Sequence, residues 1–484
     1  MPYFIAMAAN IEEKVVSDWI NELFKKQQEH VTTYRNEPVS ARKNRLIQLR
    51  KWVLSHKPMI QNAIYADFRK PEMEVDATEI FPVINELSHA LANLERWTKP
   101  QKIDAPLTML GTRSVVRAEP KGVCLIIAPW NYPFNLCIGP LVSALAAGNC
   151  VVIKPSEMTP HTSALIKKLC DELFDEKLVA VCEGGVEVSQ QLLKLPFDHI
   201  FFTGSPAIGK VVMRAAAEHL TSVTLELGGK SPAVITASAN LKDAAKRIAV
   251  SKYINNGQTC IAPDYVLVHE SVKTEFIEQL KVQITTLFSE KGKSIEGSPY
   301  YARIVNERHF KRLSQMLEDA IERGAGLSFG GTVKADENFI HPTILTDVPA
   351  QARVLEEEIF GPILPVNSFS TLEAAIALIN EKPKPLALYI FGSNKSEQNQ
   401  ILSQTSSGGV CINDCAVHFL HHNLPFGGVN NSGIGKAHGH FGFMAFSNEK
   451  PVLRQRSGLT SFQPFYPPYT KSVKKMMDWL LKFI

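Results

Sequence analysis

The amino-acid sequence predicts an α/β fold with two largely parallel sheets and a separate arm. Short apolar, β-branched runs alternate with segments of helical spacing, which is typical of parallel strands joined by helices that cover both faces of a sheet. The first series of runs is GVCLIIAPW, NCVVIKP, LVAVCEG and HIFFTG, and the second is SPAVITA, YVLVH, LSFGG, FIHPTILTDV, LPVNSF and LALYIFG. A chain of 484 residues is also long enough for two or three domains.

Helices and an arm are expected before the first series. Residues 11–36 and 41–68 space their apolar residues three and four apart, which predicts amphipathic helices. Residues 99–112 are rich in Pro and turn residues, and residues 112–122, TRSVVRAEPKG, predict an exposed strand or hairpin arm. We expect the boundary between the two α/β units at Leu225–Pro232, where two glycines and a proline follow a strand.

The composition is that of an ordinary globular protein in a reducing compartment. Hydrophobic residues make up 45% and charged residues 21%, and a net charge of +4 gives no reason to expect a nucleic-acid surface. The eight cysteines have no repeated spacing and most lie in apolar runs, which predicts reduced, buried thiols. With no secretory signal and no apolar run of the ~18 residues that a membrane span needs, the expected location is cytoplasmic.

Two segments are candidates for binding a nucleotide. In HIFFTGSPAIGKVVMRAAAEHL, Gly204, Ser205 and Gly209 lie between an apolar strand and an amphipathic helix, where free amides favour a phosphate. The pattern is G-x4-G rather than G-x-G-x-x-G, so a plain strand-to-helix turn is the alternative. In VVIKPSEMTP, Lys154 and Glu157 follow a buried strand, where ligands of α/β sheets bind; they are candidates for ribose hydroxyls, and a solvated turn is the alternative.

Three further residues are candidates for chemistry. Asn131 in APWNYPF is an amide at a strand end, able to donate to an oxyanion or simply to form a turn. Glu226 in TLELGGKSP is either exposed at an edge or buried with a raised pKa, and the second case makes a general base. Cys260 follows the polar approach NNGQT, which is unusual for an inert core thiol, so it is a candidate nucleophile.

Two other patterns each allow more than one interpretation. CINDCAVHFLHH places Cys411, Cys415, His418 and His421 close together, but the spacing does not match that of zinc sites, and we expect no metal. The tail KSVKKMMDWLLKFI places Val473, Met476, Met477, Leu480 and Ile484 on one helical face. Docking of this face on the protein's own body or on a partner subunit is expected, with peripheral contact to a membrane surface as the alternative.

Taken together, these segments resemble the NAD(P)-dependent aldehyde dehydrogenase family. The shared motifs are APWNYPF, KPSE, FTGSPAIG, LELGGKSP, NNGQTC, EEIFGP and LPFGGVNNSGIG, in family order and over nearly the whole chain to about Leu453. The compact N-terminus and the YPPYTKS tail are most similar to the class 3 branch, which includes fatty- and aromatic-aldehyde enzymes. Where many relatives carry Thr, this chain has Pro206, which puts one hydroxyl contact to phosphate in doubt.

The resemblance implies an activity and a set of roles. A medium- or long-chain aliphatic or an aromatic aldehyde would be oxidised to the acid through a cysteine thiohemiacetal and thioester, with hydride transfer to NAD or, less favoured because of Glu157, NADP. The implied roles are Cys260 as nucleophile, Glu226 as general base, Asn131 as oxyanion donor, Lys154 and Glu157 at the adenosine ribose, Gly204, Ser205 and Gly209 at the pyrophosphate, and Glu358 and Phe360 at the nicotinamide ribose and ring.

The resemblance also implies an architecture. A Rossmann-type cofactor-binding domain would comprise residues 1–102 and 122–228, and an α/β catalytic domain residues 229–413. Residues 103–121 and 414–484 would form an oligomerisation arm and C-terminal tail that pair the chain in a homodimer, and the tail is shorter than the membrane anchor of some fatty-aldehyde enzymes.

The proposed chemistry requires a deprotonated thiol, so the thiol of Cys260 is expected to have a pKa below the free value of about 8.5.

Two other functions compete with this hypothesis. A thiol hydrolase acting on activated esters would use Cys260 and Asn131 without any cofactor, and would leave KPSE and EEIFGP unexplained. A non-catalytic binding protein on the same fold would have no physical need to keep the full set of chemical residues. Nucleotide-dependent turnover of an aldehyde distinguishes the first hypothesis from these two, and activity toward esters without such turnover indicates the thiol hydrolase.

Overall fold

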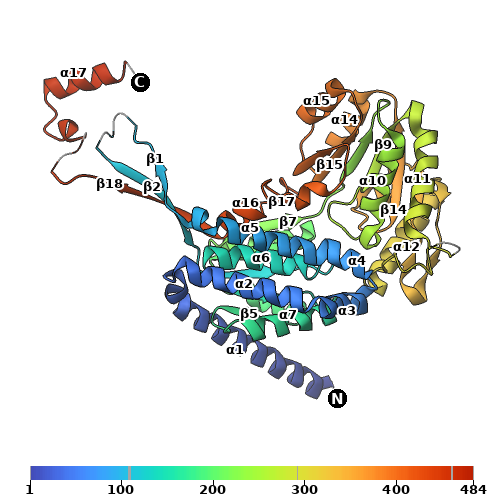
Figure 1. The fold of residues 1–484 in the computed structure, drawn as a ribbon, viewed down its shortest axis with the longest axis horizontal. Helices are drawn as coiled ribbons and strands as arrows, with labels where there is room; N and C mark the ends of the chain where they lie inside the picture. The colour runs from blue at the N-terminus through green and yellow to red at the C-terminus, as the bar shows by residue number, and fades with distance from the viewer. Residues whose placement is uncertain are drawn as a thin grey trace.

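The structure consists of two α/β bodies and a long arm (Figure 1). This computed structural model describes residues 2–106, 109, 111–290, 293–458, 460 and 462–482, with side chains described from residue 16 onward. Within that part of the chain, every helix is too short or too polar to cross a lipid bilayer.

The N-terminal helices form one layer of the first body. They are α1 (Pro2–Arg35), α2 (Val39–Ser55), α3 (Lys57–Phe68), α4 (Glu72–Val75), a π-helical turn η1 (Asp76–Ile80) and α5 (Phe81–Thr98). Their apolar faces are buried against the first sheet and its helices, so the predicted amphipathic helices are confirmed.

The first sheet is the six-stranded β17-β7-β6-β3-β4-β5. Its strands are β3 (Val123–Ile127), β4 (Cys150–Lys154), β5 (Val179–Val181), β6 (His199–Gly204), β7 (Ser222–Leu227) and β17 (Gly433–Ile434), joined by α6 (Asn135–Ala147), α7 (Pro160–Leu173), α8 (Val186–Leu192) and α9 (Pro206–Ala217). All strand pairs are parallel except β17–β7, in which Gly433 lies opposite Glu226. The order of the strands reverses between β3 and β6, and ligands bind at such a point in α/β sheets.

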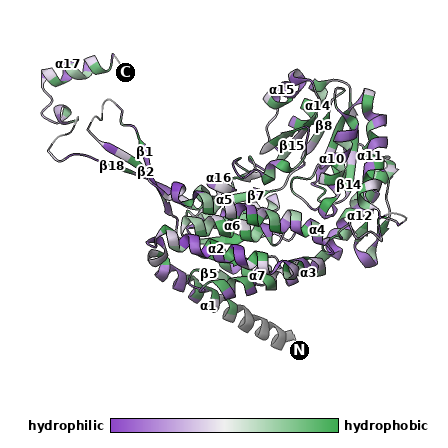
Figure 2. Ribbon diagram, in the orientation of Figure 1, coloured by the Kyte–Doolittle hydropathy of each residue, from purple (hydrophilic) through white to green (hydrophobic). Residues whose placement is uncertain are grey.

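The second sheet is the seven-stranded β10-β13-β14-β9-β8-β15-β16, with only the edge strand β10 antiparallel. Its strands are β8 (Pro232–Ile235), β9 (Tyr265–His269), β10 (Gly326–Phe329), β13 (Thr343–Thr346), β14 (Ile363–Phe369), β15 (Ala387–Phe391) and β16 (Gly409–Ile412). The helices around it are α10 (Leu241–Tyr253), α11 (Lys273–Phe288), α12 (Glu307–Glu322), α13 (Arg353–Glu356), α14 (Leu372–Asn380) and α15 (Lys395–Gln404), and β11 (Val333–Lys334) and β12 (Phe339–Ile340) form a separate ribbon. Figure 2 shows the hydrophobic strands of both bodies between helices of mixed hydropathy.

The arm is the antiparallel sheet β1-β2-β18, formed by β1 (Gln101–Ile103), β2 (Arg113–Pro120) and β18 (Ser447–Arg454). Beyond it lies the amphipathic helix α17 (Lys471–Leu480), clear of both bodies, so the expectation that this helix docks on the protein's own body is wrong (Figure 1). Ile484, predicted on the apolar face of the tail, lies outside the described residues.

Part of the segment assigned to the arm and tail belongs to the first body instead. Residues 433–445 supply β17 to the first sheet and then α16 (Gly439–Ala445), which packs against α5 and α6. Phe443 and Phe446 are buried in the core of that body, which explains why the chain returns to it before entering the arm.

Candidate active site

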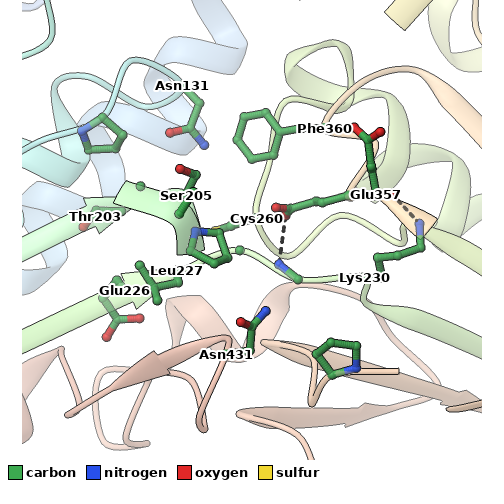
Figure 3. Close-up of a pocket in the computed structure, with 18 of the residues that line it drawn as sticks. Asn131, Thr203, Ser205, Glu226, Leu227, Lys230, Cys260, Glu357, Phe360 and Asn431 are labelled. Carbon is green, nitrogen blue, oxygen red and sulfur yellow. Dashed lines mark hydrogen bonds between the residues drawn. The ribbon is translucent and has the colours of Figure 1, made fainter. Parts of the chain in front are cut away.

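A cavity of ≈ 530 Å³ lies between the two bodies and is lined by residues of both (Figure 3). Seven of the predicted site residues line it: Asn131, Gly204, Ser205, Glu226, Cys260, Glu358 and Phe360. The carboxyl ends of β3, β6 and β7 supply one wall, as expected where the strand order reverses. The loop before β9 and the loop after α13 supply the other.

Asn131 is fixed by hydrogen bonds from three directions. It follows β3, and its side chain is 3% exposed. Its amide nitrogen Nδ2 donates to the carbonyl of Gln258 at 3.1 Å. Its backbone carbonyl accepts from Nδ2 of Asn255 at 2.8 Å and from Nζ of Lys70 at 3.3 Å. An amide has a second N–H, so the side chain keeps one donor for a ligand.

A buried ion pair lies behind Asn131. Nζ of Lys70 donates to Oε1 of Glu79 at 2.7 Å, and both side chains are fully buried. Glu79 also accepts from the backbone N–H of Asn135 at 2.9 Å, at the start of α6. A buried pair is costly unless its remaining hydrogen bonds are satisfied, and here they tie α6 and the Asn131 turn to the N-terminal helices.

The turn before Cys260 is built from residues that tolerate left-handed backbone. Asn255 and Asn256 have φ of 53° and 56°, and Gly257 has φ of 73°. A Cβ on Gly257 would lie 2.3 Å from the carbonyl oxygen of Gly361, so a glycine is required where the two loops meet. The turn predicted from Asn256 and Gly257 is therefore confirmed, and it leaves Cys260 half-buried in the cavity wall.

The predicted lowering of the thiol pKa is wrong for this structure. Burial raises the pKa of Cys260 to about 12, with further contributions from the carboxyls of Glu358 and Glu226. Hydrogen bonds from the backbone N–H groups of Cys260 and Ile261 favour the thiolate but offset only part of this. Lys230 and Arg312 also line the cavity, but both are engaged with groups of the neighbouring loop, so a further positive charge in the cavity would favour the thiolate.

Glu226 is the buried alternative of the two considered from the sequence. Its side chain is 6% exposed, and burial raises the pKa of its carboxyl well above the ordinary value, against a smaller opposing effect of Lys436. Neither carboxyl oxygen accepts a hydrogen bond from the described residues. In Figure 3 the carboxyl of Glu226 lies away from Asn131 and Phe360.

The loop that carries Glu358 and Phe360 is held by backbone contacts. Oε1 of Glu358 accepts from the backbone N–H of Gly229 at 3.0 Å, and burial raises the pKa of Glu358 to about 7. Phe360, with φ of 51°, places its ring edge-on to Trp130, with 5.3 Å between ring centroids.

Two cations that the sequence interpretation missed support this loop. Nζ of Lys230 donates to the carbonyls of Val354 and Glu357, each at 2.8 Å, and forms a buried ion pair with Asp264. Arg312 donates to the carbonyl of Ile359 at 2.7 Å. Lys230 stands inside the LELGGKSP motif, which could have indicated it, whereas nothing local indicates Arg312.

The predicted nucleotide residues separate into three positions. Gly204 and Ser205 line the cavity at the N-terminus of α9, where Ser205 caps the helix by accepting from the N–H of Ile208. Gly209 lies behind them, and its missing Cβ leaves room for Leu227, 2.7 Å from where that atom would be. Lys154 and Glu157 do not line the cavity; they pair at 2.7 Å at the end of β4, the neighbour of β3.

The metal-like cysteine and histidine cluster is partly assembled. Sγ of Cys411 lies 3.1 Å from Nδ1 of His418. No group of three or more His, Cys, Asp or Glu side chains among the described residues is placed to hold a metal ion.

Comparison with known proteins gives a consistent result. A sequence profile of the aldehyde dehydrogenase family matches residues 7–452. The chain is 42% identical to 4,4'-diaponeurosporen-aldehyde dehydrogenase of Staphylococcus aureus, covering 94% of this chain and 98% of that protein. It is 44% identical to aldehyde dehydrogenase family 3 member A2 of Pongo abelii, covering 92% and 90%.

Solved structures agree. The substrate-bound state of Staphylococcus aureus AldH superposes with a TM-score of 0.91 at 42% identity, covering 95% of this chain and 99% of that one. An aldehyde dehydrogenase of Mycobacterium tuberculosis complexed with NAD+ superposes with a TM-score of 0.83 at 28% identity, covering 92% and 91%.

Proposed function

The chain belongs to the aldehyde dehydrogenase family and oxidises an aldehyde to the carboxylic acid with NAD(P), and from this premise we propose that Cys260 is its nucleophile, Asn131 its oxyanion donor and Glu226 its general base. The proposal rests on one observation, the presence of all three side chains in the wall of a single cavity. Three groups of complementary chemistry, far apart in the sequence, line one cavity between the two bodies.

The proposed steps follow from the chemistry of an aldehyde. The Cys260 thiolate adds to the carbonyl carbon, and the thiohemiacetal oxyanion accepts hydrogen bonds from the Asn131 amide and the backbone N–H of Cys260. NAD(P) held by Glu358 and Phe360 would supply the acceptor for the hydride that leaves this carbon, and the positive charge of its oxidised form would favour the thiolate. Glu226 then takes a proton from water as the water attacks the thioester; the C–S bond breaks and the acid is released.

The cavity fits a dinucleotide. The N-terminus of α9 opens on it at Ser205, which suits a pyrophosphate. We propose that Gly204 and Ser205 hold the phosphates and that Glu358 and Phe360 hold the nicotinamide ribose and ring. In this proposal Lys154 and Glu157 hold the adenosine ribose, and Gly209 only allows α9 to pack on Leu227.

Cofactor preference follows from Glu157. Its carboxylate is 40% exposed beside Lys154 and would repel a 2′-phosphate, so NAD should be preferred to NADP. Glu157→Gln should shift the ratio of kcat/KM for NAD over NADP toward NADP by about tenfold, by removing one like charge. Lys167→Gln, which alters a more exposed ion pair on α7, is the control, and an unchanged ratio in Glu157→Gln would contradict the assignment.

We propose that the preferred aldehydes are medium- or long-chain aliphatic or aromatic. Pro129, Trp130 and Leu136 form an apolar surface of the large cavity that Cys260 also lines, which favours apolar over charged substrates. A relative named for 4,4'-diaponeurosporen-aldehyde is consistent with this class. Steady-state rates for aldehydes of rising chain length and for ring-substituted benzaldehydes, with each cofactor, test it; a preference for short polar aldehydes would refute it.

Cys260→Ala tests the nucleophile. We expect it to abolish NAD(P)H production and the acyl adduct that mass spectrometry detects on the wild-type protein. Turnover of an activated ester by the wild type without any nucleotide-dependent oxidation of an aldehyde would favour the thiol hydrolase instead.

We propose that the arm pairs two copies of the chain in a homodimer. Ile103 and Leu453 on the arm are 49% and 48% exposed, and Phe462 just beyond it is 46% exposed, so the arm offers apolar side chains that a second copy of the chain could cover. Light scattering coupled to gel filtration should give about twice the 53.7 kDa of one chain, and a monomeric mass would overturn the proposal.

A cytoplasmic location, peripheral to a membrane or not, remains a prediction. Figure 2 shows α17 with mixed hydropathy at the end of the arm, and Lys471, Lys474 and Lys475 make it basic. Flotation with anionic liposomes, comparing the full chain with one ending at Thr470, tests membrane contact; equal flotation would exclude it.

A further inference from the structure

A second, smaller cavity of ≈ 50 Å³ lies on the inner side of Cys260 and Glu226, and both residues line it. One part of its wall is apolar, with Leu386, Phe419 and Phe426. Another part is polar, with Glu86, Ser143 and His438. The proposed reaction gives none of these polar groups a task. These polar groups line the same cavity as Glu226, the proposed general base, and are therefore placed to act on its proton.

Glu226 has to lose a proton in every catalytic cycle. It gains one from the attacking water, and it can act again only after that proton reaches solvent. Its two oxygens are buried and accept no hydrogen bond from the described residues, so the proton needs an intermediate carrier. The small cavity is large enough for one or two water molecules and has polar groups to hold them.

Glu86 and His438 connect this cavity with the surface. Oε1 of Glu86 accepts from the backbone N–H of Gly439 at 2.7 Å, and Oε2 lies 3.7 Å from Nδ1 of His438. The Glu86 side chain is 7% exposed, whereas that of His438 is 20% exposed. His438 therefore reaches both the small cavity and the solvent.

The backbone of His438 is held in an unfavourable conformation. Its φ of 70° and ψ of 141° lie in a region that is essentially restricted to glycine. The ring is held edge-on against Phe419 and Phe426, with centroid distances of 4.6 Å and 5.3 Å. Strain of this kind persists only where surrounding structure enforces it, and such positions cluster at functional sites.

The other titratable groups near His438 come from two neighbouring elements. His418 approaches from the short helix η6 (Val417–Leu420), and His89 approaches Glu86 from the same helix, α5. The ring of His89 packs at a tilt against that of His422, with centroids 4.1 Å apart, beyond Gly439. Neither His89 nor His422 lines the small cavity.

We propose that His438, oriented by Glu86, carries the proton of Glu226 to solvent through water held in the small cavity. The protonated Glu226 gives its proton to this water while the water gives one to the imidazole, so Glu226 returns to the carboxylate and His438 becomes the imidazolium. The imidazolium then releases the proton to bulk water at its exposed edge. No electron is transferred and no other bond changes. The inference rests on the proposed role of Glu226 as general base.

His438→Gly is the principal test, because glycine suits the backbone conformation and leaves space for an added imidazole. Stopped-flow measurement should show an unchanged burst of NAD(P)H, because acylation at Cys260 does not need this path. Steady-state kcat should fall by about tenfold, less than the 10²–10⁴-fold typical of a group that acts on the reacting atoms, because His438 acts through water, and imidazole should restore it in a saturable manner. His422→Ala, which alters a nearby histidine outside the cavity, should behave as the wild type.

Glu86→Gln provides a second variant that keeps the shape of the side chain. It should lower kcat less than His438→Gly and should not respond to imidazole, because the ring is present but poorly oriented. Loss of the burst in His438→Gly, an unchanged kcat, or a low kcat that imidazole fails to raise would each overturn the proposal. Failure of the role of Glu226 itself would be seen separately, as an absence of accumulated acyl-enzyme in Glu226→Gln.

Discussion

Asn131 and Glu226 line the same cavity from the same sheet, yet they are held in opposite ways. Asn131 and its backbone make hydrogen bonds to Lys70, Asn255 and Gln258. The carboxyl of Glu226 accepts none from the described residues, although both side chains are buried. The Asn131 turn is therefore fixed by protein contacts, whereas the Glu226 carboxyl is buried without hydrogen bonds to the described residues.

The difference matches the tasks proposed for the two groups. A group that stabilises a developing charge is most effective when its dipole is already oriented, because no reorganisation is then needed during the reaction. A group that takes and releases protons must exchange partners in each cycle, and fixed hydrogen bonds to the carboxylate would lower its basicity. Rigidity is therefore expected where charge develops, and freedom where a proton moves.

Glu226→Gln should have the largest effect, because it removes the free group while keeping its shape. Thioester hydrolysis should slow by about 10²–10⁴-fold, the usual contribution of a general base, and acyl-enzyme should accumulate on Cys260. Single-turnover kinetics with mass spectrometry of the quenched protein measure both. A wild-type rate of hydrolysis in this variant would contradict the role of Glu226 as general base.

The pH dependence of the same step gives the sign of the effect. Burial raises the pKa of Glu226, so the active carboxylate is scarce at low pH and increases as the pH rises toward that pKa. In the wild type, hydrolysis should therefore rise by about tenfold per pH unit below the pKa and then level off. In Glu226→Gln this ascending limb should be absent.

Asn131→Ala should have the next largest effect, at the locked end. Loss of one oxyanion donor typically costs about 10²–10³-fold in kcat. Here the loss should slow both the burst of NAD(P)H and the hydrolysis of acyl-enzyme, because both steps build negative charge on the same carbonyl oxygen. Rapid-mixing experiments that follow both steps measure it, and a wild-type burst in Asn131→Ala would contradict the role proposed for Asn131.

Lys70→Met should have the smallest catalytic effect of these variants, and it tests the contacts that hold Asn131. It leaves Glu79 buried without its cation, which typically costs about 3–5 kcal/mol of stability. It also removes one contact of the Asn131 turn, so kcat should fall by about tenfold or less, because Asn131 keeps its bond to Gln258. Lys43→Met breaks a more exposed pair with Glu95 and should change stability by less than about 1 kcal/mol. Denaturant unfolding of the two variants provides the check.

The sequence predicted the parallel sheets, and its motifs, together with the family resemblance, predicted most of the cavity lining. Cys260, Asn131 and Glu226 stand in short motifs whose residue types express their chemistry. The contacts that position them are different. Lys70 is 61 residues from Asn131, and Glu86 is 353 residues from Gly439. Apolar spacing predicts that a helix buries one face, but not which buried polar group it will meet there.

Residues 433–445 were predicted to belong to the arm and tail because their sequence has no clear hydrophobic period that would assign them elsewhere. Their place in the first body follows from a contact distant in sequence, the pairing of Gly433 with Glu226. The raised pKa of Cys260 could not be predicted from the sequence either, because it depends on how completely the walls of the cavity exclude water.

The pairing of β17 with β7 has a consequence for protein synthesis. Chains fold progressively as they leave the ribosome, at about 5–20 residues per second, and early domains form first. The neighbour that flanks Glu226 is translated more than 200 positions after it. The emerging polypeptide can thus form the parallel strands of both large sheets before β17 is available to pair with β7, and a chain released before Gly433 would have Cys260 in place but would lack the strand beside Glu226.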